Sequence, residues 1–128
     1  MFGYAPEPVH VRTGGPQGVV LPLAEVGDAA VATSAYGDQR RHVRGRWVTS
    51  LIDPRTSMPI MSTRTVSVIA STCMVADALT KVVALRGRDA MSLLRACDAA
   101  AAILSPAAGR WRCTLLSQQP PVALTLAA

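Results

Sequence analysis

The sequence changes its hydrophobic period near residue 71, and this change constrains the fold more than any other feature. Residues 65–70, TVSVIA, are rich in β-branched residues and predict a strand. From Thr72 onward the apolar residues recur with the 3.6-residue period of a helix, with Ser71 or Thr72 as N-cap and Gly87 as the stop. The apolar stripe expected to face the core consists of Met74, Val75, Ala78, Leu79, Val82 and Val83.

Short strand-forming runs precede this helix, and a shorter helix and a hairpin follow it. We expect strands at residues 9–12, 19–23, 29–34, 38–43 and 46–52, with a turn at residues 13–16 and a hairpin tip at Arg44-Gly45. Further predictions are a second helix at residues 89–97, a closing hairpin from residues 100–104 and 110–116, and a loose tail at residues 117–128. Strands, two helices and strands again predict an α+β domain of antiparallel strands over residues 1–116.

Composition limits the class of protein. Of the 128 residues, 50% are hydrophobic but only 4% are aromatic, so the core must be built from Ala, Val, Leu and Ile. The charged fraction of 16% excludes a disordered chain, and the net charge of +5 favours anionic partners without identifying one. No segment approaches the ~18 apolar residues of a membrane span, and residues 1–10 lack the features of a signal peptide. We therefore expect a cytoplasmic chain with no membrane span.

The three cysteines, Cys73, Cys97 and Cys113, are odd in number and widely spaced. This pattern predicts neither a zinc site nor a disulfide framework. Free cysteine is among the most buried residue types, so we expect reduced and mostly buried thiols.

One side of the predicted long helix carries Cys73, Asp77, Thr80 and Lys81. A carboxylate and a hydroxyl one turn apart suit a hard cation such as magnesium, which takes few protein carboxylates and completes its shell with water and phosphates. The alternative is an ordinary ion pair between Asp77 and Lys81, four residues apart, which contributes about 0.3–0.5 kcal/mol. The residues alone leave both interpretations open.

Two further segments carry candidate chemistry. Residues 51–56, LIDPRT, end a strand in a turn whose amides and Arg55 can hold phosphate, although Asp53 can equally be an Asx-turn residue. Residues 39–47 are basic with one aromatic residue. Nucleic-acid binding would need this basic patch to continue elsewhere, so we expect a solvated hairpin edge and no nucleic-acid partner.

Taken together, three segments resemble the FAD:protein FMN transferases, the ApbE family. Residues 30–36, AVATSAY, are similar to the family's A-V-A-T-S-G-x-Y segment, residues 51–59, LIDPRTSMP, to its H-I-L-D-P-R-T-G-x-P segment, and residues 76–79, ADAL, to its A-D-A-L helix. Their order and spacing also fit. The resemblance implies the C-terminal part of the family's T-fold-like domain.

The resemblance also implies an activity, protein flavinylation: magnesium-dependent transfer of FMN from FAD to a Thr or Ser of a target flavoprotein. It implies Asp77 as a magnesium ligand, assisted by the positions of Thr80 and Lys81. Leu51 and Asp53 would line the flavin side, and Thr33 and Ser34 would support the site. The implied partners are FAD and the target flavoprotein.

The sequence departs from the family pattern at several positions. Lys81 stands where the family commonly has Thr, Ser50 where it often has His, and Ala35 and Ser57 where it has glycines. Family members are also longer at their N-terminal side, where most flavin contacts lie, and are often exported, as a longer parent of this chain could be. We therefore expect an FMN transferase fragment that is inactive alone, the alternative being a noncatalytic remnant or accessory domain.

Overall fold

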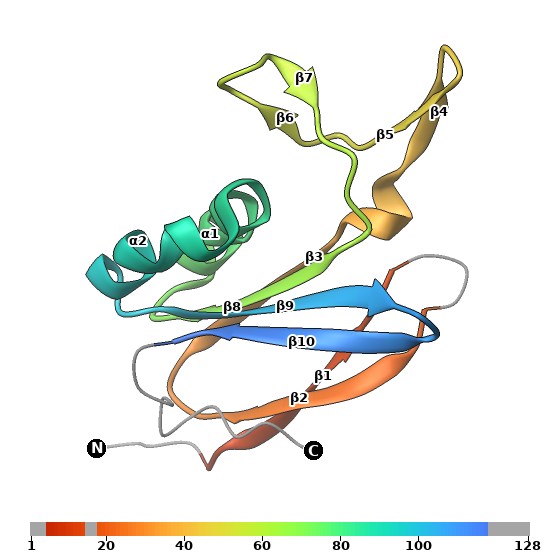
Figure 1. Cartoon of the computed structure of the whole chain (residues 1–128). Coiled ribbons are helices and arrows are strands. Elements are labelled where there is room, and N and C mark those ends of the chain that lie inside the picture. The colour runs from red at the N-terminus through yellow and green to blue at the C-terminus, as the bar shows by residue number, and fades with distance from the viewer. Residues whose placement is uncertain (1–4, 15–17, 118–128) are drawn as a thin grey trace.

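The centre of the protein is a four-stranded antiparallel sheet with the strand order β10-β9-β8-β3. The structure, a computed structural model, describes residues 5–14 and 18–117 (Figure 1). The sheet is formed by β3 (Ala30–Ala35), β8 (Thr65–Ala70), β9 (Ala100–Ala107) and β10 (Arg110–Leu116). Thr33 pairs with Ser67, which in turn pairs with Ala102. This arrangement confirms the α+β fold with antiparallel strands.

Both faces of the sheet are covered. Helix α1 (Cys73–Arg86) lies over one face, and the hairpin of β1 (Glu7–Arg12) and β2 (Val20–Val26) lies under the other (Figure 1). Consecutive residues of β8 alternate between the two layers: Val66 and Val68 pack toward the helix, and Ile69 packs toward the hairpin. All six β8 residues are buried, including the polar Thr65 and Ser67, because both faces of this central strand are covered.

In the sequence, two small hairpins lie between β3 and β8. They extend from one end of the sheet (Figure 1). One pairs β4 (Arg41–Val43) with β5 (Arg46–Val48), and the other pairs β6 (Ile52–Asp53) with β7 (Met58–Pro59). The predicted tip is confirmed, since Arg44 and Gly45 adopt φ angles of 49° and 79°. The strand predicted at residues 38–43 is wrong at its start, because residues 38 and 39 belong to the 3-10 turn η1 (Tyr36–Gln39).

Helix α1 has the predicted ends but a different buried face. The Thr72 hydroxyl accepts a hydrogen bond from the Val75 amide, and Gly87, with a φ angle of 55°, ends the helix. Met74 is 80% exposed and Ala78 is exposed, so the predicted stripe is wrong at these positions. The buried positions are Ala76, Leu79, Thr80 and Val83. Small residues such as Ala76 let the helix approach the sheet closely. Hydropathy alone predicted Met74 as a buried position, because it does not take this close approach into account.

The second predicted helix is shorter than expected. It consists of the 3-10 turn η2 (Gly87–Ala90) and the six-residue helix α2 (Met91–Ala96). The closing hairpin is confirmed as β9 and β10. In the expected turn at residues 13–16, Thr13 bonds to Val19 through its amide and its hydroxyl, while residues 15 and 16 lie outside the described residues. Of the predicted tail, residues 118–128 also lie outside them.

The cysteines are free, as expected, but they are not mostly buried. Cys73 and Cys113 are exposed, and Cys97 is half-buried. Cys73 is the first residue of α1 and lies outside its packed face, so position on the helix outweighs the general tendency of cysteine to be buried. None of the helices in the described residues is long and apolar enough to cross a membrane.

Candidate functional site

Two of the three motif segments meet where β3 passes under α1. The Ser34 and Thr80 hydroxyl oxygens lie 3.0 Å apart, and the Thr80 hydroxyl donates to the Asp77 carbonyl oxygen at 2.7 Å. Because that bond uses the Thr80 proton, Ser34 is the donor to Thr80. Thr80 is fully buried, which corrects its predicted place on a polar face beside Asp77 and Lys81. Its hydroxyl tolerates burial because both its donor and its acceptor functions are used.

Asp77 and Lys81 lie beside this buried pair, on the solvent side of α1. The Lys81 ammonium donates to Asp77 Oδ1 at 3.0 Å and to the Asp77 carbonyl oxygen at 3.2 Å. The side chains are 47% (Lys81) and 65% (Asp77) exposed, so solvent screens the pair and its contribution to stability is about 0.3–0.5 kcal/mol. The helix ion pair that the sequence left open is therefore present.

The oxygens around Asp77 do not fit magnesium in this arrangement. Asp77 Oδ1 and the Asp77 carbonyl oxygen already accept bonds from the Lys81 ammonium. A divalent ion ~4 Å from that ammonium would be repelled by about 2 kcal/mol at the dielectric constant of water, and by up to about 8 kcal/mol at an effective dielectric constant of ~20; the exposure of Lys81 favours the lower value. Among the described residues there is also no group of three or more His, Cys, Asp or Glu that could hold a metal. Lys81 thus supplies the positive charge at this position.

Tyr36 ends the first motif segment, residues 30–36, and the sequence alone assigns it no role. It is 2% exposed, and its hydroxyl has no hydrogen-bond partner within the described part of the chain. Burial raises the pKa of the Tyr36 phenol, and Ser34 and Lys81 oppose part of that rise. An unpaired buried hydroxyl costs about 1–3 kcal/mol. The site therefore contains a polar group that lacks a partner within the described chain.

The Leu51 backbone is engaged within its own hairpin. Its carbonyl oxygen accepts from the Ile60 amide at 2.9 Å, and its amide donates to the Thr49 hydroxyl at 3.3 Å. The Leu51 side chain is half-buried against the helix-side core. The 3.3 Å bond is long, so it is the weaker of the two contacts and the one that a ligand acceptor would replace more easily.

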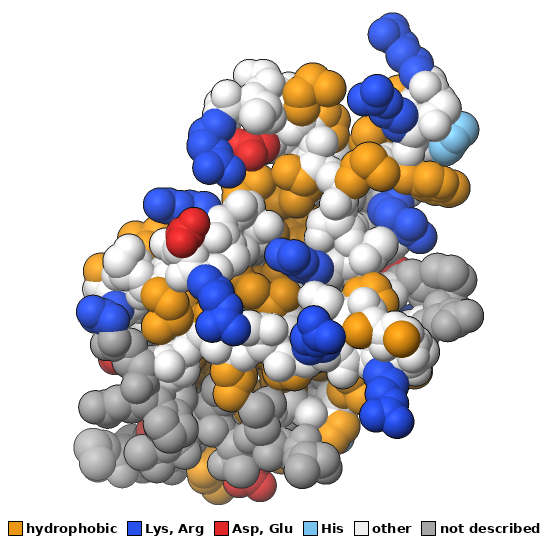
Figure 2. Space-filling view, in the orientation of Figure 1, with side chains coloured by type: hydrophobic (Ala, Val, Ile, Leu, Met, Phe, Trp, Pro, Cys, Tyr) orange, Lys and Arg blue, Asp and Glu red, His pale blue; other side chains and the backbone are white. Residues whose placement is uncertain are grey.

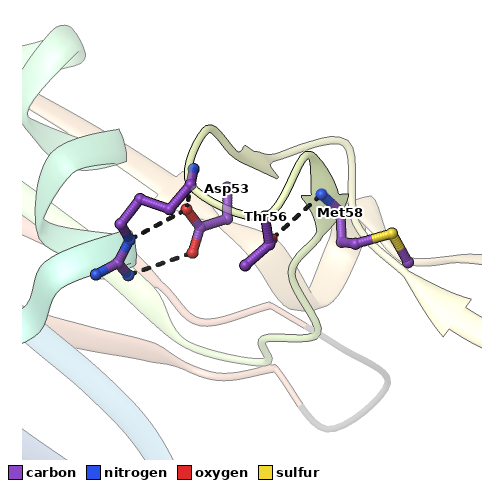
Figure 3. Close-up of polar contacts among 4 residues, drawn as sticks. Asp53, Thr56 and Met58 are labelled. Atoms are coloured by element: carbon purple, nitrogen blue, oxygen red, sulfur yellow. Dashed lines mark hydrogen bonds and ion pairs between the residues drawn. The ribbon is translucent and has the colours of Figure 1, made fainter.

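Asp53 lies at the start of the turn between β6 and β7 (Figure 3). Its carboxylate accepts from the Arg55 amide at 2.9 Å and from two guanidinium nitrogens at 3.3 Å each. These bonds hold the pKa of Asp53 below its usual value. The Asp53 side chain is 16% exposed and that of Arg55 73% exposed. The bond to the amide two residues ahead is an Asx-turn, so the turn-forming role of Asp53 is present in the structure.

Ser57 completes the same turn. It adopts a φ angle of 56°, in the left-handed region that favours glycine, at a position where the family motif has glycine. The Thr56 hydroxyl accepts from the Met58 amide at 3.3 Å and closes the loop (Figure 3). The positive φ angle explains why the family motif has glycine at this position. Ser57 adopts the same conformation at some cost in backbone strain.

The predicted flavin-site residues do not share one surface. Ser34 points toward α1, whereas Thr33 points to the opposite face of the sheet, where its hydroxyl lies 2.7 Å from that of Ser67. Neighbouring residues of a strand always alternate in this way. Leu51 and Asp53 lie on the separate β6–β7 hairpin. The structure therefore brings Ser34, Asp77, Thr80 and Lys81 together with Tyr36 and leaves Thr33 apart.

Most of the basic segment at residues 39–47 lies in the β4–β5 hairpin, which begins at Arg41. The Arg40 guanidinium lies 5.3 Å from the centre of the Trp47 ring, and the His42 ring packs edge-on against the same ring at 5.2 Å. Trp47 contacts these two nearby side chains but remains 50% exposed, in keeping with an exposed hairpin edge.

Comparison with known proteins places this fold and its motifs in a class. The sequence profile of the ApbE family matches residues 3–104, and the chain belongs to that family. Among solved structures it is similar to the flavin transferase ApbE from Vibrio cholerae, with a TM-score of 0.63 and 25% identity over 88% of this chain and 36% of that one. A mutant of the same protein gives a TM-score of 0.57, 26% identity and coverages of 86% and 36%.

A third solved structure is similar in fold. It is the apo form of the flavinyl transferase ApbE from Pseudomonas stutzeri, with a TM-score of 0.59 and 20% identity over 85% of this chain and 35% of that one. A comparison with curated proteins found no match. The chain thus spans about a third of the length of these solved relatives, and the match is the C-terminal portion that the motifs predicted.

Proposed function

We propose that this chain is the C-terminal part of an FAD:protein FMN transferase. In that reaction a Thr or Ser hydroxyl of a target flavoprotein attacks the FMN phosphorus of FAD. The diphosphate bond breaks, AMP leaves, and the hydroxyl proton passes to a base or to water. The observation that carries the proposal is the family match over residues 3–104, which includes all three motif segments.

Several residues of this chain have roles in the proposed function. The Leu51 amide is suited to meet a flavin acceptor, because its present bond to Thr49 is long. The bonded group of Ser34, Thr80 and the Asp77 carbonyl fixes α1 against β3 and so holds Lys81 in place. The Lys81 ammonium can offset part of the negative charge of a diphosphate. Magnesium, which the resemblance implies, enters no step here because the Asp77 oxygens do not fit it.

The proposal includes inactivity of the chain by itself. Catalysis requires that FAD be positioned before its phosphates react, and positioning supplies several kcal/mol of the rate enhancement. Since the chain spans about a third of its solved relatives, the remaining contacts must come from a longer protein or a second chain. Incubation with FAD, magnesium and a target flavoprotein should give no covalent flavin on the target, and a labelled target would refute this part of the proposal.

The alternative is a noncatalytic remnant or accessory domain. One observation favours it: the Asp77 and Asp53 carboxylates are already satisfied by Lys81 and Arg55. Titration of the chain with FAD, followed by flavin fluorescence, separates the two functions. A flavin-site fragment should bind FAD, and Ser34→Ala should weaken that binding while Thr33→Ala, on the opposite face, should leave it unchanged. Absence of FAD binding, or FAD binding that Ser34→Ala leaves unchanged, would favour the remnant.

A further inference from the structure

A hollow of about 850 Å³ opens on the helix side of the sheet, beside the C-terminal end of α1. Its floor comes from β9 and β10, through Ile103, Ser105 and Thr114, and its walls come from residues 60–64 and residues 86–89. Figure 2 shows basic side chains gathered on the face in view, over β9 and β10. Four arginines line the hollow, which we name the arginine basin: Arg64, Arg86, Arg88 and Arg112.

The charges of the arginine basin are poorly balanced. Asp89 is the acidic residue among its lining residues, so the lining carries a formal charge of +3. The ion pairs within the described residues join Asp53 to Arg55 and Asp77 to Lys81, and none includes a basin arginine. The bond to Asp53 raises the pKa of Arg55, and Asp89 adds to this rise as the smallest of the causes. Four exposed arginines therefore line one hollow with a single carboxylate among its lining residues.

We propose that the arginine basin binds a small ligand with two linked phosphate groups, of the nucleoside diphosphate class. A guanidinium presents a planar fork that bonds two phosphate oxygens at once. A nucleoside diphosphate carries a charge of about −3 near neutral pH. This charge would balance the formal charge of +3 on the lining residues. Hydroxyl donors come from Ser62, Thr63, Ser105 and Thr114.

The size and the wall composition of the basin agree with this ligand class. Pockets for small molecules and cofactors occupy roughly 300–1,000 Å³, and the basin falls within that range. Ile60 and Pro106 add apolar surface on which a base or sugar can lie. The phosphates would lie among the arginines, and the organic part against this apolar surface.

The arginine basin is separate from the candidate flavin site. Ser34, Tyr36, Asp77, Thr80 and Lys81 are absent from its lining residues. We therefore expect a chain without transferase activity still to bind the diphosphate in the basin.

The test is isothermal titration calorimetry of the whole chain at low salt, with ADP, inorganic pyrophosphate, AMP and adenosine as probes. The variant Arg88→Ala/Arg112→Ala removes one guanidinium from each side of the basin. The matched control, Arg41→Ala/Arg95→Ala, removes the same charge from exposed positions outside it. We expect ADP and pyrophosphate to bind more tightly than AMP, and adenosine not to bind. The basin variant should weaken ADP binding about tenfold or more, and the control much less.

Three results would overturn the proposal. The first is a native chain that binds neither ADP nor pyrophosphate. The second is equal weakening by the basin variant and the control, which would indicate a diffuse cationic surface; random single-stranded DNA would then bind and respond to both variants alike. The third is adenosine binding as tight as that of ADP, which would show that the phosphates are not recognised. Circular dichroism of each variant checks that all of them are folded.

Discussion

Replacing Lys81 by threonine should increase the magnesium affinity of this chain. The substitution removes the ammonium that donates to Asp77 Oδ1 at 3.0 Å and supplies a hydroxyl oxygen one helical turn from Asp77. Because the Lys81 side chain is 47% exposed, the repulsion of a nearby divalent ion must be discounted for solvent. At the dielectric constant of water a separation of ~4 Å gives about 2 kcal/mol, or roughly a 30-fold gain in affinity.

The assay is calorimetric titration with magnesium, repeated with manganese and followed by electron paramagnetic resonance. Lys81→Arg is the matched control, because it keeps the positive charge and should bind no better than the native chain. Adding Asp77→Asn to Lys81→Thr should remove the gain. Equal and tight binding by the native chain and Lys81→Thr would refute the reasoning, since Lys81 would then not hold the cation position. A loss of several kcal/mol of stability on Lys81→Thr would contradict the exposed pair, for which we expect about 0.5 kcal/mol.

Three further predictions follow from single contacts. Tyr36→Phe should leave the stability of the chain unchanged or raise it by up to about 1 kcal/mol in urea unfolding, because it removes a buried hydroxyl without a described partner; a clear loss would reveal a hidden partner. Ser57→Gly should stabilise the chain by about 0.5–1 kcal/mol in the same assay, because it relieves a φ angle of 56°. Since Arg55 lowers the pKa of Asp53, the β6–β7 hairpin should keep the stabilisation from this pair above about pH 4 and lose it as the pH falls through the lowered pKa. The substitution Arg55→Gln should shift the Asp53 titration, followed by carboxyl NMR, to higher pH. An unshifted titration would contradict this pairing.

The main elements could be predicted from the sequence because their signals are local. The β-branched run of β8, the Thr72 cap and the Gly87 stop lie within or beside the elements they define. The burial of Thr80 could not be predicted in this way, since it depends on Ser34, which is 46 residues away in the sequence. Polarity suggested a solvent-facing Thr80, but the Asp77 carbonyl oxygen and the Ser34 hydroxyl together satisfy its hydroxyl inside the protein.

Some features of the site follow from local sequence rules. Thr33 and Ser34 are neighbours in a predicted strand, so strand alternation already implied that they face opposite sides. The Asp-Pro-Arg sequence at residues 53–55 predicted the Asx-turn. In contrast, the arginines of the basin are scattered from residue 64 to residue 112, and only the fold brings them to one hollow.

The two outer strands of the sheet differ in their protection against further pairing. The edge strand β10 carries Arg110 and Arg112, and charged side chains discourage the addition of another strand. The opposite edge strand, β3, has the sequence AVATSA, with no charge and no proline, and within the described chain it pairs on one side only, with β8. Its outer backbone is therefore a template for strand addition. A neighbouring strand from a longer protein would complete the sheet there, and without one the isolated chain should self-associate through this edge as its concentration rises.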